Sequence, residues 1–401
     1  VDAAEKVAPV LPQMLGANGQ TRHYLVLAMS NVEIRACGGF PGSRGVMSVT
    51  DGKLELGDFV KVDMMKEPLS PLPITDEEAN LFTTGWGLTG FNTLGYTMGD
   101  VTMTPDYPRA AQLASDMQKA IVGDDIDGVF AVDPVFLQYM LGIVGGTQLP
   151  DGTVVDGSNA AKVLLHDIYW NYPVEEQDAI FAAVAGSAFN KIVGELGSSD
   201  ITKIAAAIEK GASEGRILMY SRNDDEEKAA KALGISGALQ TDTSEAPILG
   251  IYVNNYSYSK MDWFLDKRVT IDSSVENADG STTYRVTTSL KNTMTPQEKA
   301  EMPGYFQGHN GISQDIDDEV LRLYLYAPAG GSISDIKTSG SGSIEMNDAT
   351  HDGLKVAWGG VHMLLGQDIK VEYTVTTSKD SGHKELKVRT TPTAQTFEQD
   401  K

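Results

Sequence analysis

The chain has 401 residues, which is more than one hydrophobic core usually supports, so two domains are expected. Its 41% hydrophobic and 22% charged residues are typical of a globular protein rather than a disordered one. With 32 basic and 55 acidic side chains, the formal charge is −23. Such a charge repels nucleic acid and anionic lipid surfaces. Nucleic acid is therefore excluded as a partner.

Cys37 is the only cysteine, which excludes an intrachain disulfide and a Cys-based zinc site. Beside two glycines, it is expected to be a small buried hydrophobe. No apolar run approaches the ~20 residues that span a bilayer. Because the chain begins at Val1 without a methionine, we expect a targeting or anchoring segment ahead of it.

The first quarter of the chain predicts strands followed by a long loop. Residues 23–30 form a buried-strand pattern, and a turn-rich segment follows. A hairpin comes next, with Asp51-Gly52 as its turn. Residues 68–106 have no steady periodicity and predict a long loop. Residues 108–121 predict a helix, with Pro108 in its first turn.

Residues 126–155 combine a strand, a short helix and a Gly-Gly step. Asp133 is expected to cap the helix, Pro134 to begin it and Gly145 to help end it. Strands that alternate with helices indicate an α/β layered domain with a largely parallel central sheet over residues 1–260. Its remaining elements are expected to be helices at 159–169, 174–196, 201–210 and 224–234, and strands at 216–221 and 248–255.

From about Lys260 the pattern changes to alternation of period two. Regularly spaced strands with turns between them, one of them at Asp279-Gly280, predict antiparallel sheets. The expected second domain, residues 261–401, is an immunoglobulin-like β-sandwich.

Three other sequence patterns are only weak indicators of function. "GWGLTG" (residues 85–90) has dinucleotide-site glycine spacing, but the flanking strand and helix are missing, so a Gly-rich loop is favoured. The six histidines have no metal-ligand spacing, and neither a metal nor a cofactor is expected. "DIDDE" (residues 315–319) could hold calcium, but a solvated acidic turn is the favoured interpretation.

Arg35 and Arg44 lie in the turn-rich segment after the first strand. Open α/β sheets bind ligands outside the carboxyl ends of their strands. Two guanidiniums at that place could clamp a phosphate or a carboxylate. The alternative is that Arg35 pairs with a local acid and that Arg44 caps a turn in solvent.

The sequence resembles a bacterial extracellular family, the domain-of-unknown-function 4012 family. The matching stretches are "YLVLAMSNVEIRACGGFPGSRGVMSV", "DVTMTPDYPRAAQLASDM", "IDGVFAVDPVFLQYMLGIVGGTQLPDGTVVDGSNAAKVLL" and "NNYSYSKMDWFLD". They occur in this order over most of the first 270 residues. The resemblance implies a cell-surface protein of Gram-positive bacteria, tethered by a transmembrane helix ahead of this sequence.

The order of elements is more distantly similar to the LytR-CpsA-Psr phosphotransferases, which move glycopolymers from polyprenyl pyrophosphate lipids to the cell wall. The sequence departs from that family's pattern. Asn31 stands where the family has a metal-binding acid, and Arg44 is followed by Gly45 rather than Ser-Asp. Where the family has paired arginines on a later helix, this chain has Tyr169 and Tyr172. The scaffold is therefore expected to be shared, but not necessarily the reaction.

These observations favour a cell-surface binding or scaffold protein of envelope glycan assembly. The alternative is a phosphotransferase that acts on a lipid-linked glycan. The expected partner is an envelope glycan or a lipid-linked glycan precursor. The candidate binding residues, around the end of the first strand and on the later helix, are Arg35, Arg44, Asn31, Asp106, Tyr169 and Tyr172.

Overall fold

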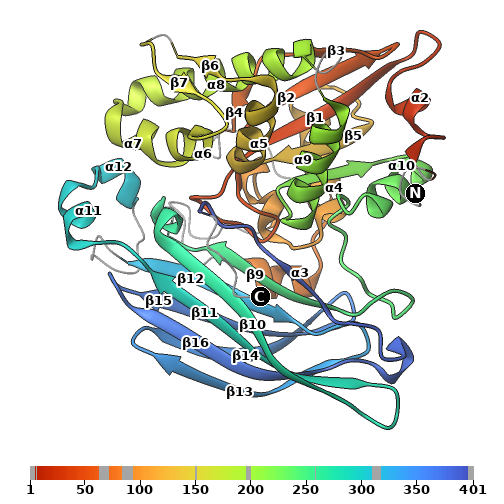
Figure 1. Ribbon diagram of the computed structural model, residues 1–401, viewed down its shortest axis with the longest axis vertical. Coiled ribbons are helices and arrows are strands. Elements are labelled where there is room, and N and C mark those ends of the chain that lie inside the picture. The colour runs from red at the N-terminus through yellow and green to blue at the C-terminus, as the bar shows by residue number, and fades with distance from the viewer. Residues whose placement is uncertain are drawn as a thin grey trace. The chain divides into compact units, whose positions relative to one another are not determined.

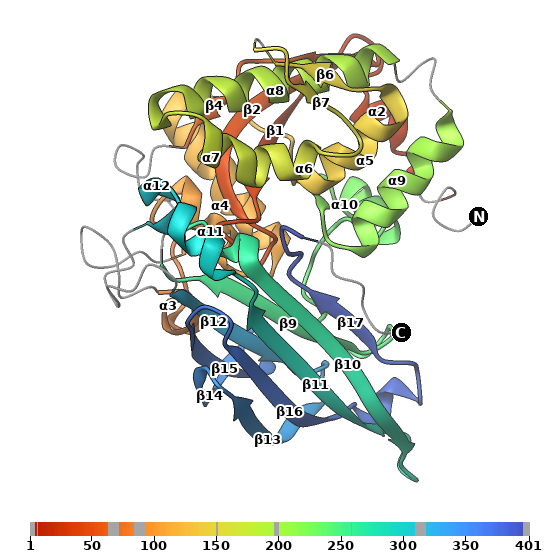
Figure 2. The ribbon, with the colours of Figure 1, turned by 60° about the vertical axis from the view of Figure 1, so that its left-hand side comes forward.

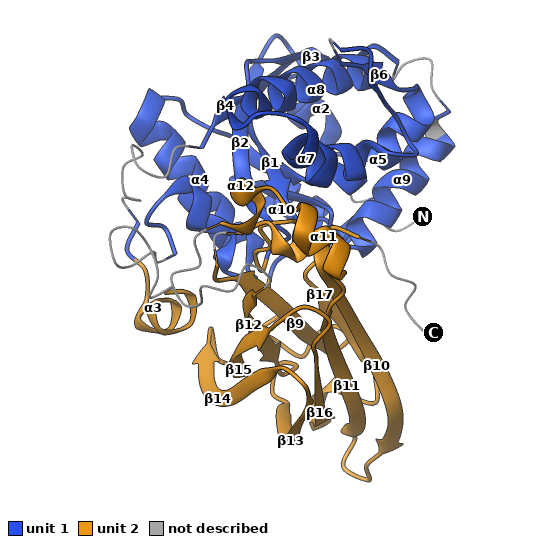
Figure 3. Cartoon of the chain, turned by 90° about the vertical axis from the view of Figure 1, so that its left-hand side faces the viewer, with its two compact units in different colours: residues 1–31, 37–73, 94–238 blue, residues 32–36, 74–93, 239–401 orange. Residues whose placement is uncertain are grey.

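The structure is a computed structural model in which the chain divides into two compact units (Figure 3). Unit 1 contains residues 1–31, 37–73 and 94–238, and unit 2 contains residues 32–36, 74–93 and 239–401. The residues described here are 5, 7–62, 72–83, 94–149, 151–195, 200–257, 259–308 and 318–395.

Unit 1 is built on a six-stranded sheet with the order β3-β2-β1-β5-β8, in which β4 also pairs with β2 (Figure 1). Its strands are β1 (Thr21–Ser30), β2 (Phe40–Thr50), β3 (Lys53–Leu56), β4 (Val60–Lys61), β5 (Gly128–Val132) and β8 (Ile217–Ser221). The β2–β3 hairpin turns at Asp51 and Gly52, whose φ angles are 48° and 79°. This is the Asp-Gly turn predicted from the sequence.

The expectation of a largely parallel sheet is wrong. β1 and β5 are parallel, but β8 runs antiparallel to β5, and β2 runs antiparallel to β1. The helical segment after β5 delivers the chain to the carboxyl end of β5, where Ile217 pairs with Val132. β8 must therefore run back along β5.

Unit 1 also contains the helices that the sequence predicts. The structure has α2 (Leu11–Met14), α4 (Tyr107–Val122), α5 (Pro134–Val144), α6 (Ala160–Lys162), α7 (Ile168–Asn171), α8 (Val174–Glu195), α9 (Ile201–Ser213) and α10 (Asp224–Ala232), with the small β6 (Thr147–Gln148) and β7 (Val154–Val155) pairing beyond α5. A π-helical turn, η2 (Val163–Asp167), joins α6 to α7. The expected helix at 159–169 is thus formed from three consecutive pieces.

Helices and sheet share a core in which the strand side chains alternate between faces. Tyr24 and Val26 pack with Ala230 of α10 on one face of the sheet. Leu25 and Leu27 point to the other face and are also fully buried. The strands are thus covered on both sides, as expected of the central layer of an α/β domain.

Residues 68–106 are not the continuous loop that the sequence predicts. The described part contains α3 (Asp76–Phe82), which belongs to unit 2, and a 3-10 helix in unit 1, η1 (Met98–Met103). α3 begins with a capping box in which Thr75 and Glu78 bond each other's backbone. The "GWGLTG" motif lies outside the described residues.

Unit 2 contains two sheets, with the orders β10-β11-β16-β13 and β14-β15-β12-β9-β17 (Figure 2). The strands are β9 (Ile248–Asn255), β10 (Leu265–Glu276), β11 (Thr282–Asn292), β12 (Glu319–Tyr326), β13 (Ser332–Gly340), β14 (Ser343–His351), β15 (Leu354–Met363), β16 (Asp368–Thr376) and β17 (Lys387–Thr390). Short helices accompany them: η3 (Met261–Phe264), α11 (Pro296–Glu301), α12 (Gly304–Gln307) and η4 (Lys379–Ser381).

Both sheets of unit 2 contribute to one hydrophobic cluster, with Val253 and Leu323 from one sheet and Leu290 and Val371 from the other. β9 was expected to be the last strand of the first domain. It instead pairs with β12 and β17 in unit 2. The reason is that its side chains are buried against this second core rather than against the core of unit 1.

Candidate functional site

The candidate site lies at the carboxyl ends of the two parallel strands of unit 1. β1 ends at Ser30 and β5 ends at Val132, and Asn31 and Asp133 follow them directly. Because β1 and β5 are parallel neighbours, both residues emerge at the same edge of the sheet. Asn31 is 0% exposed and Asp133 is 1% exposed.

Each carboxylate oxygen of Asp133 accepts a hydrogen bond. Its Oδ1 accepts a hydrogen bond from the backbone N–H of Phe136 at 2.8 Å, which caps α5 as the sequence predicts. Its Oδ2 accepts one from Nη1 of Arg216, also at 2.8 Å. Burial raises the pKa of Asp133, while the guanidinium opposes this shift. With these donors on both oxygens, we assign the carboxylate as ionised.

Arg216 reaches this site because β8 is antiparallel to β5. It immediately precedes β8, so it lies beside the carboxyl end of β5. Its Nε donates to Oε2 of Glu214, and the hydroxyl of Tyr139 donates to the same oxygen at 2.8 Å. Arg216 is 3% exposed, so its charge is neutralised mainly by Asp133 and Glu214.

Sequence reasoning did not identify Arg216 as a site residue. In a parallel sheet, a residue that precedes a strand lies at the opposite edge from the carboxyl ends. The available signal was an arginine directly before the buried strand "ILMYS". A buried arginine needs an anionic partner, and Asp133 was already placed after a strand.

Asn31 fixes the turn after β1 but keeps one atom without a partner. Its Nδ2 donates to the carbonyl oxygen of Gly38 at 3.0 Å, and its side chain also contacts Asp133. Within the described part of the chain, the Oδ1 atom of Asn31 has no hydrogen-bond partner, and neither has the buried Oγ atom of Ser30. Buried polar atoms are usually bonded, so these two atoms leave hydrogen-bonding capacity unused at this end of β1.

The turn at residues 37–39 packs tightly over the end of β1. A Cβ atom on Gly39 would lie 2.4 Å from the carbonyl oxygen of Ser30, so this position needs a glycine. The carbonyl oxygen of Gly39 accepts a bond from Oγ1 of Thr102 at 2.9 Å. Cys37 is 5% exposed, and its Sγ lies 2.8 Å from the carbonyl oxygen of Thr104. The cysteine is thus buried, as expected.

The two candidate arginines lie in different units. Arg44, on β2 in unit 1, is 5% exposed, and its Nε donates to Oε1 of Gln118 in α4 at 2.9 Å. Arg35, in unit 2, is 4% exposed, and its Nη1 donates to the carbonyl oxygens of Ile34 and Asn255 at 3.2 Å each. Both guanidiniums are bonded to protein groups. A shared ligand clamp stays a prediction.

The other three candidates lie at separate places in unit 1. Asp106 is the N-cap residue of α4, and its backbone N–H donates to Oγ1 of Thr104. Tyr169 is buried on α7, where its ring lies 5.5 Å from that of Phe181. Tyr172 follows α7, and its hydroxyl donates to Asp151. Their roles as ligand contacts also stay predictions.

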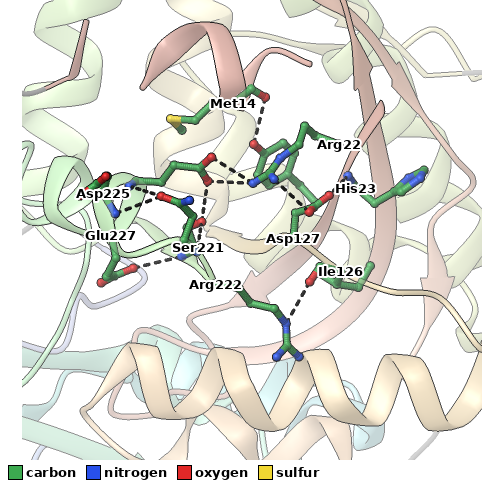
Figure 4. Close-up of polar contacts among 12 residues, drawn as sticks. Met14, Arg22, His23, Ile126, Asp127, Ser221, Arg222, Asp225 and Glu227 are labelled. Atoms are coloured by element: carbon green, nitrogen blue, oxygen red, sulfur yellow. Dashed lines mark hydrogen bonds and ion pairs between the residues drawn. The ribbon is translucent and has the colours of Figure 1, made fainter. Parts of the chain in front are cut away.

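A second polar network, at the amino ends of β1 and β5, is structural (Figure 4). Arg22 bonds both carboxylate oxygens of Glu226 at 2.9–3.0 Å and pairs with Asp127 at 3.1 Å. Ser221 donates to the same glutamate. These bonds tie β1, β5 and β8 to α10, with Arg22 placed between the two carboxylates.

The described residues contain no group of three or more His, Cys, Asp or Glu side chains arranged to hold a metal ion. Among the same residues, no helix is long and apolar enough to cross a membrane.

Residues 19–169 match the family model described as "Protein of unknown function (DUF4012)", so the chain is similar to this family, as the sequence predicts. A comparison with curated proteins found no match.

The solved structures that resemble the chain include three bacterial proteins, each at low identity. Protein gbs0355 from Streptococcus agalactiae is 12% identical, with a TM-score of 0.33 over 54% of this chain and 74% of that one. TagV from B. subtilis is 12% identical, with a TM-score of 0.30 over 55% and 81%. Lin1025 from Listeria innocua is 10% identical, with a TM-score of 0.28 over 55% and 80%.

Proposed function

We propose that this chain is a cell-surface binding or scaffold protein of bacterial envelope glycan assembly. In this proposal, the carboxyl ends of β1 and β5 bind a hydroxyl-bearing part of an envelope glycan or of its lipid-linked precursor. The protein acts outside the cell, held by an anchor ahead of this sequence. Residues 261–401 serve as an immunoglobulin-like sandwich, which the core shared by the two sheets of unit 2 supports.

The observation that carries the proposal is the pair of unpartnered polar atoms at the end of β1. Oγ of Ser30 and Oδ1 of Asn31 have no hydrogen-bond partner in the described part of the chain. The charged groups beside them, Asp133 and Arg216, neutralise each other. A hydroxyl and an amide oxygen next to an ion pair favour a neutral group that both donates and accepts, such as a sugar hydroxyl.

The same geometry is less suited to transfer of a phosphoryl group. That chemistry requires cationic groups aimed at the developing phosphate charge. Arg216 is bonded to Asp133 and Glu214, and Asn31 offers a neutral oxygen where a metal ion prefers a carboxylate. Recognition without transfer is therefore favoured. We retain Arg35, Arg44, Asp106, Tyr169 and Tyr172 as proposed ligand contacts.

The test is the affinity for a panel of solubilised envelope polysaccharides, measured by calorimetry. Ser30→Ala removes an acceptor that has no partner in the described part of the chain, so it should leave the melting temperature unchanged. We expect at least one polysaccharide to bind, and this variant to bind it about tenfold more weakly.

The matched control is Ser48→Ala, since Ser48 lies in β2 opposite His23, at the other end of β1. It should bind like the unmodified protein. If no polysaccharide binds, or if Ser30→Ala binds with unchanged affinity, the strand-end site is wrong.

A further inference from the structure

Two carboxyl groups lie buried in contact with each other in unit 2. Asp262, in η3, is 1% exposed, and Glu319, the first residue of β12, is 0% exposed. The two side chains interact electrostatically. Neither Oε atom of Glu319 has a hydrogen-bond donor among the described residues. A carboxylate that is buried beside another one without a donor is strongly destabilised, so one of the two must be protonated.

The surroundings identify Glu319 as the protonated group. Oδ2 of Asp262 accepts bonds from the backbone N–H of Ile34 at 2.6 Å and from Nδ2 of Asn255 at 2.8 Å, and the charge of Arg35 favours its ionised form. Apart from Asp262, Glu319 has no partner among the described residues. Burial, and then the Asp262 charge, raise the pKa of Glu319 well above its ordinary value.

The burial of this pair corrects an expectation from the sequence. The "DIDDE" stretch was expected to be a solvated acidic turn. Its last two residues, Asp318 and Glu319, are 2% and 0% exposed. β12 begins at Glu319, which places both side chains inside unit 2. The first three residues of the stretch lie outside the described part.

Asp262 helps to hold the segment of residues 32–36, which crosses into unit 2 directly after β1. The side chain of Ile34 in this segment is fully buried in the core of unit 2. The backbone N–H of Ile34 donates to Asp262, and its C=O accepts from the N–H of Asn255. The backbone N–H of Ala36 donates to Asn254, and its C=O accepts from the hydroxyl of Thr391. Of these four bonds, only the one to Asp262 involves a side chain that can gain or lose a proton.

We propose that Asp262 and Glu319 form a proton-dependent latch, which holds residues 32–36 in unit 2 while Glu319 is protonated and releases them when it ionises. Ionisation would place two negative charges in contact where neither is hydrated. Arg35 is one cation that offsets the pair. Among the described residues, Lys260 pairs with Glu33 at 3.4 Å, and Nε2 of His362 lies 3.2 Å from Oδ1 of Asp318.

The direction of the pH effect follows from proton linkage. A pKa that is raised in the folded state means that the folded protein binds the proton more tightly than the unfolded one. The contribution of the pair is fully present below the ordinary carboxyl pKa values. It is lost as the pH rises through the raised values, about 6 for Asp262 and well above the ordinary value for Glu319. The latch therefore opens toward alkaline pH.

Cleavage by trypsin after Arg35 measures the release of the segment, because this residue is 4% exposed in the closed state. The product is followed by mass spectrometry from about pH 6 to about pH 9. The control is Glu319→Gln, whose amide can donate to Asp262 but cannot ionise. The ratio of the two cleavage rates at each pH cancels the pH dependence of trypsin itself. We expect the cleavage rate of the unmodified protein, divided by that of the variant, to rise about tenfold between the lowest and the highest pH.

A ratio that does not change with pH would overturn the latch. If calcium chloride instead protects the unmodified protein from cleavage but leaves Glu319→Gln unchanged, the pair holds a divalent cation and the proposal is wrong. If the variant does not fold, the carboxyl carbon of Glu319 can be titrated by NMR in the unmodified protein. A Glu319 pKa at or below its ordinary value would then overturn the proposal. The latch does not depend on the proposed glycan site.

Discussion

Arg216 donates a hydrogen bond to Asp133 at 2.8 Å, and both side chains are buried at the same edge of the sheet. The pair links the start of β8 to the end of β5, because the two strands are antiparallel. It also explains how a carboxylate can be buried directly after β5.

Arg216→Met should destabilise the protein by about 3–5 kcal/mol, because it leaves the Asp133 charge buried without its partner. Urea unfolding at neutral pH would measure the change. Asp133→Asn combined with Arg216→Met should recover part of the loss. Lys228→Met removes a fully exposed ion pair with Asp225 and should have no measurable effect. Equal effects of the two Met variants would contradict the buried-pair interpretation.

Asn31→Asp should lower the melting temperature at neutral pH, because it adds a second carboxylate in contact with Asp133 where Asn31 is 0% exposed. The loss should shrink as the pH falls, since protonation of either carboxyl relieves the repulsion.

Calorimetric titration should show no tight magnesium binding by the unmodified protein, because the Asn31 oxygen is neutral. Micromolar binding that disappears in Asn31→Ala would contradict this prediction.

Arg35→Ala should lower the unfolding free energy by about 1–3 kcal/mol, because the guanidinium bonds the carbonyl oxygens of Ile34 and Asn255. Arg285→Ala, an exposed change in the same unit, should be nearly neutral. Thermal unfolding followed by circular dichroism would compare the two. If Arg35→Ala is as stable as the control but loses affinity for an acidic envelope glycan, Arg35 is a ligand contact instead.

Local features were predictable from the sequence because they depend on neighbouring residues. Asp133 caps α5, and Asp51-Gly52 forms the hairpin turn, each as expected. The predicted cluster at the end of β1 was centred on arginines, whereas the structure brings Asn31, Asp133 and Arg216 together.

Features that depend on tertiary packing were not predictable. The direction of β8 and the membership of β9 follow from which core buries each strand, and both were expected otherwise. Residues 32–36 belong to unit 2 because a partner distant in sequence, Asp262, bonds the backbone of Ile34. No local pattern encodes such a contact.

The central claim is that the chain binds a glycan or its lipid-linked precursor without transferring it. The most direct measurement is incubation of the unmodified protein with a purified polyprenyl-pyrophosphate-linked glycan, magnesium and cell-wall fragments. Binding is followed by co-sedimentation with lipid vesicles that carry the glycan, and the lipid products by mass spectrometry. We expect retention on the glycan vesicles, which Ser30→Ala weakens, with the pyrophosphate linkage intact. Release of polyprenyl phosphate together with glycan-modified cell wall would contradict the claim and establish a transferase.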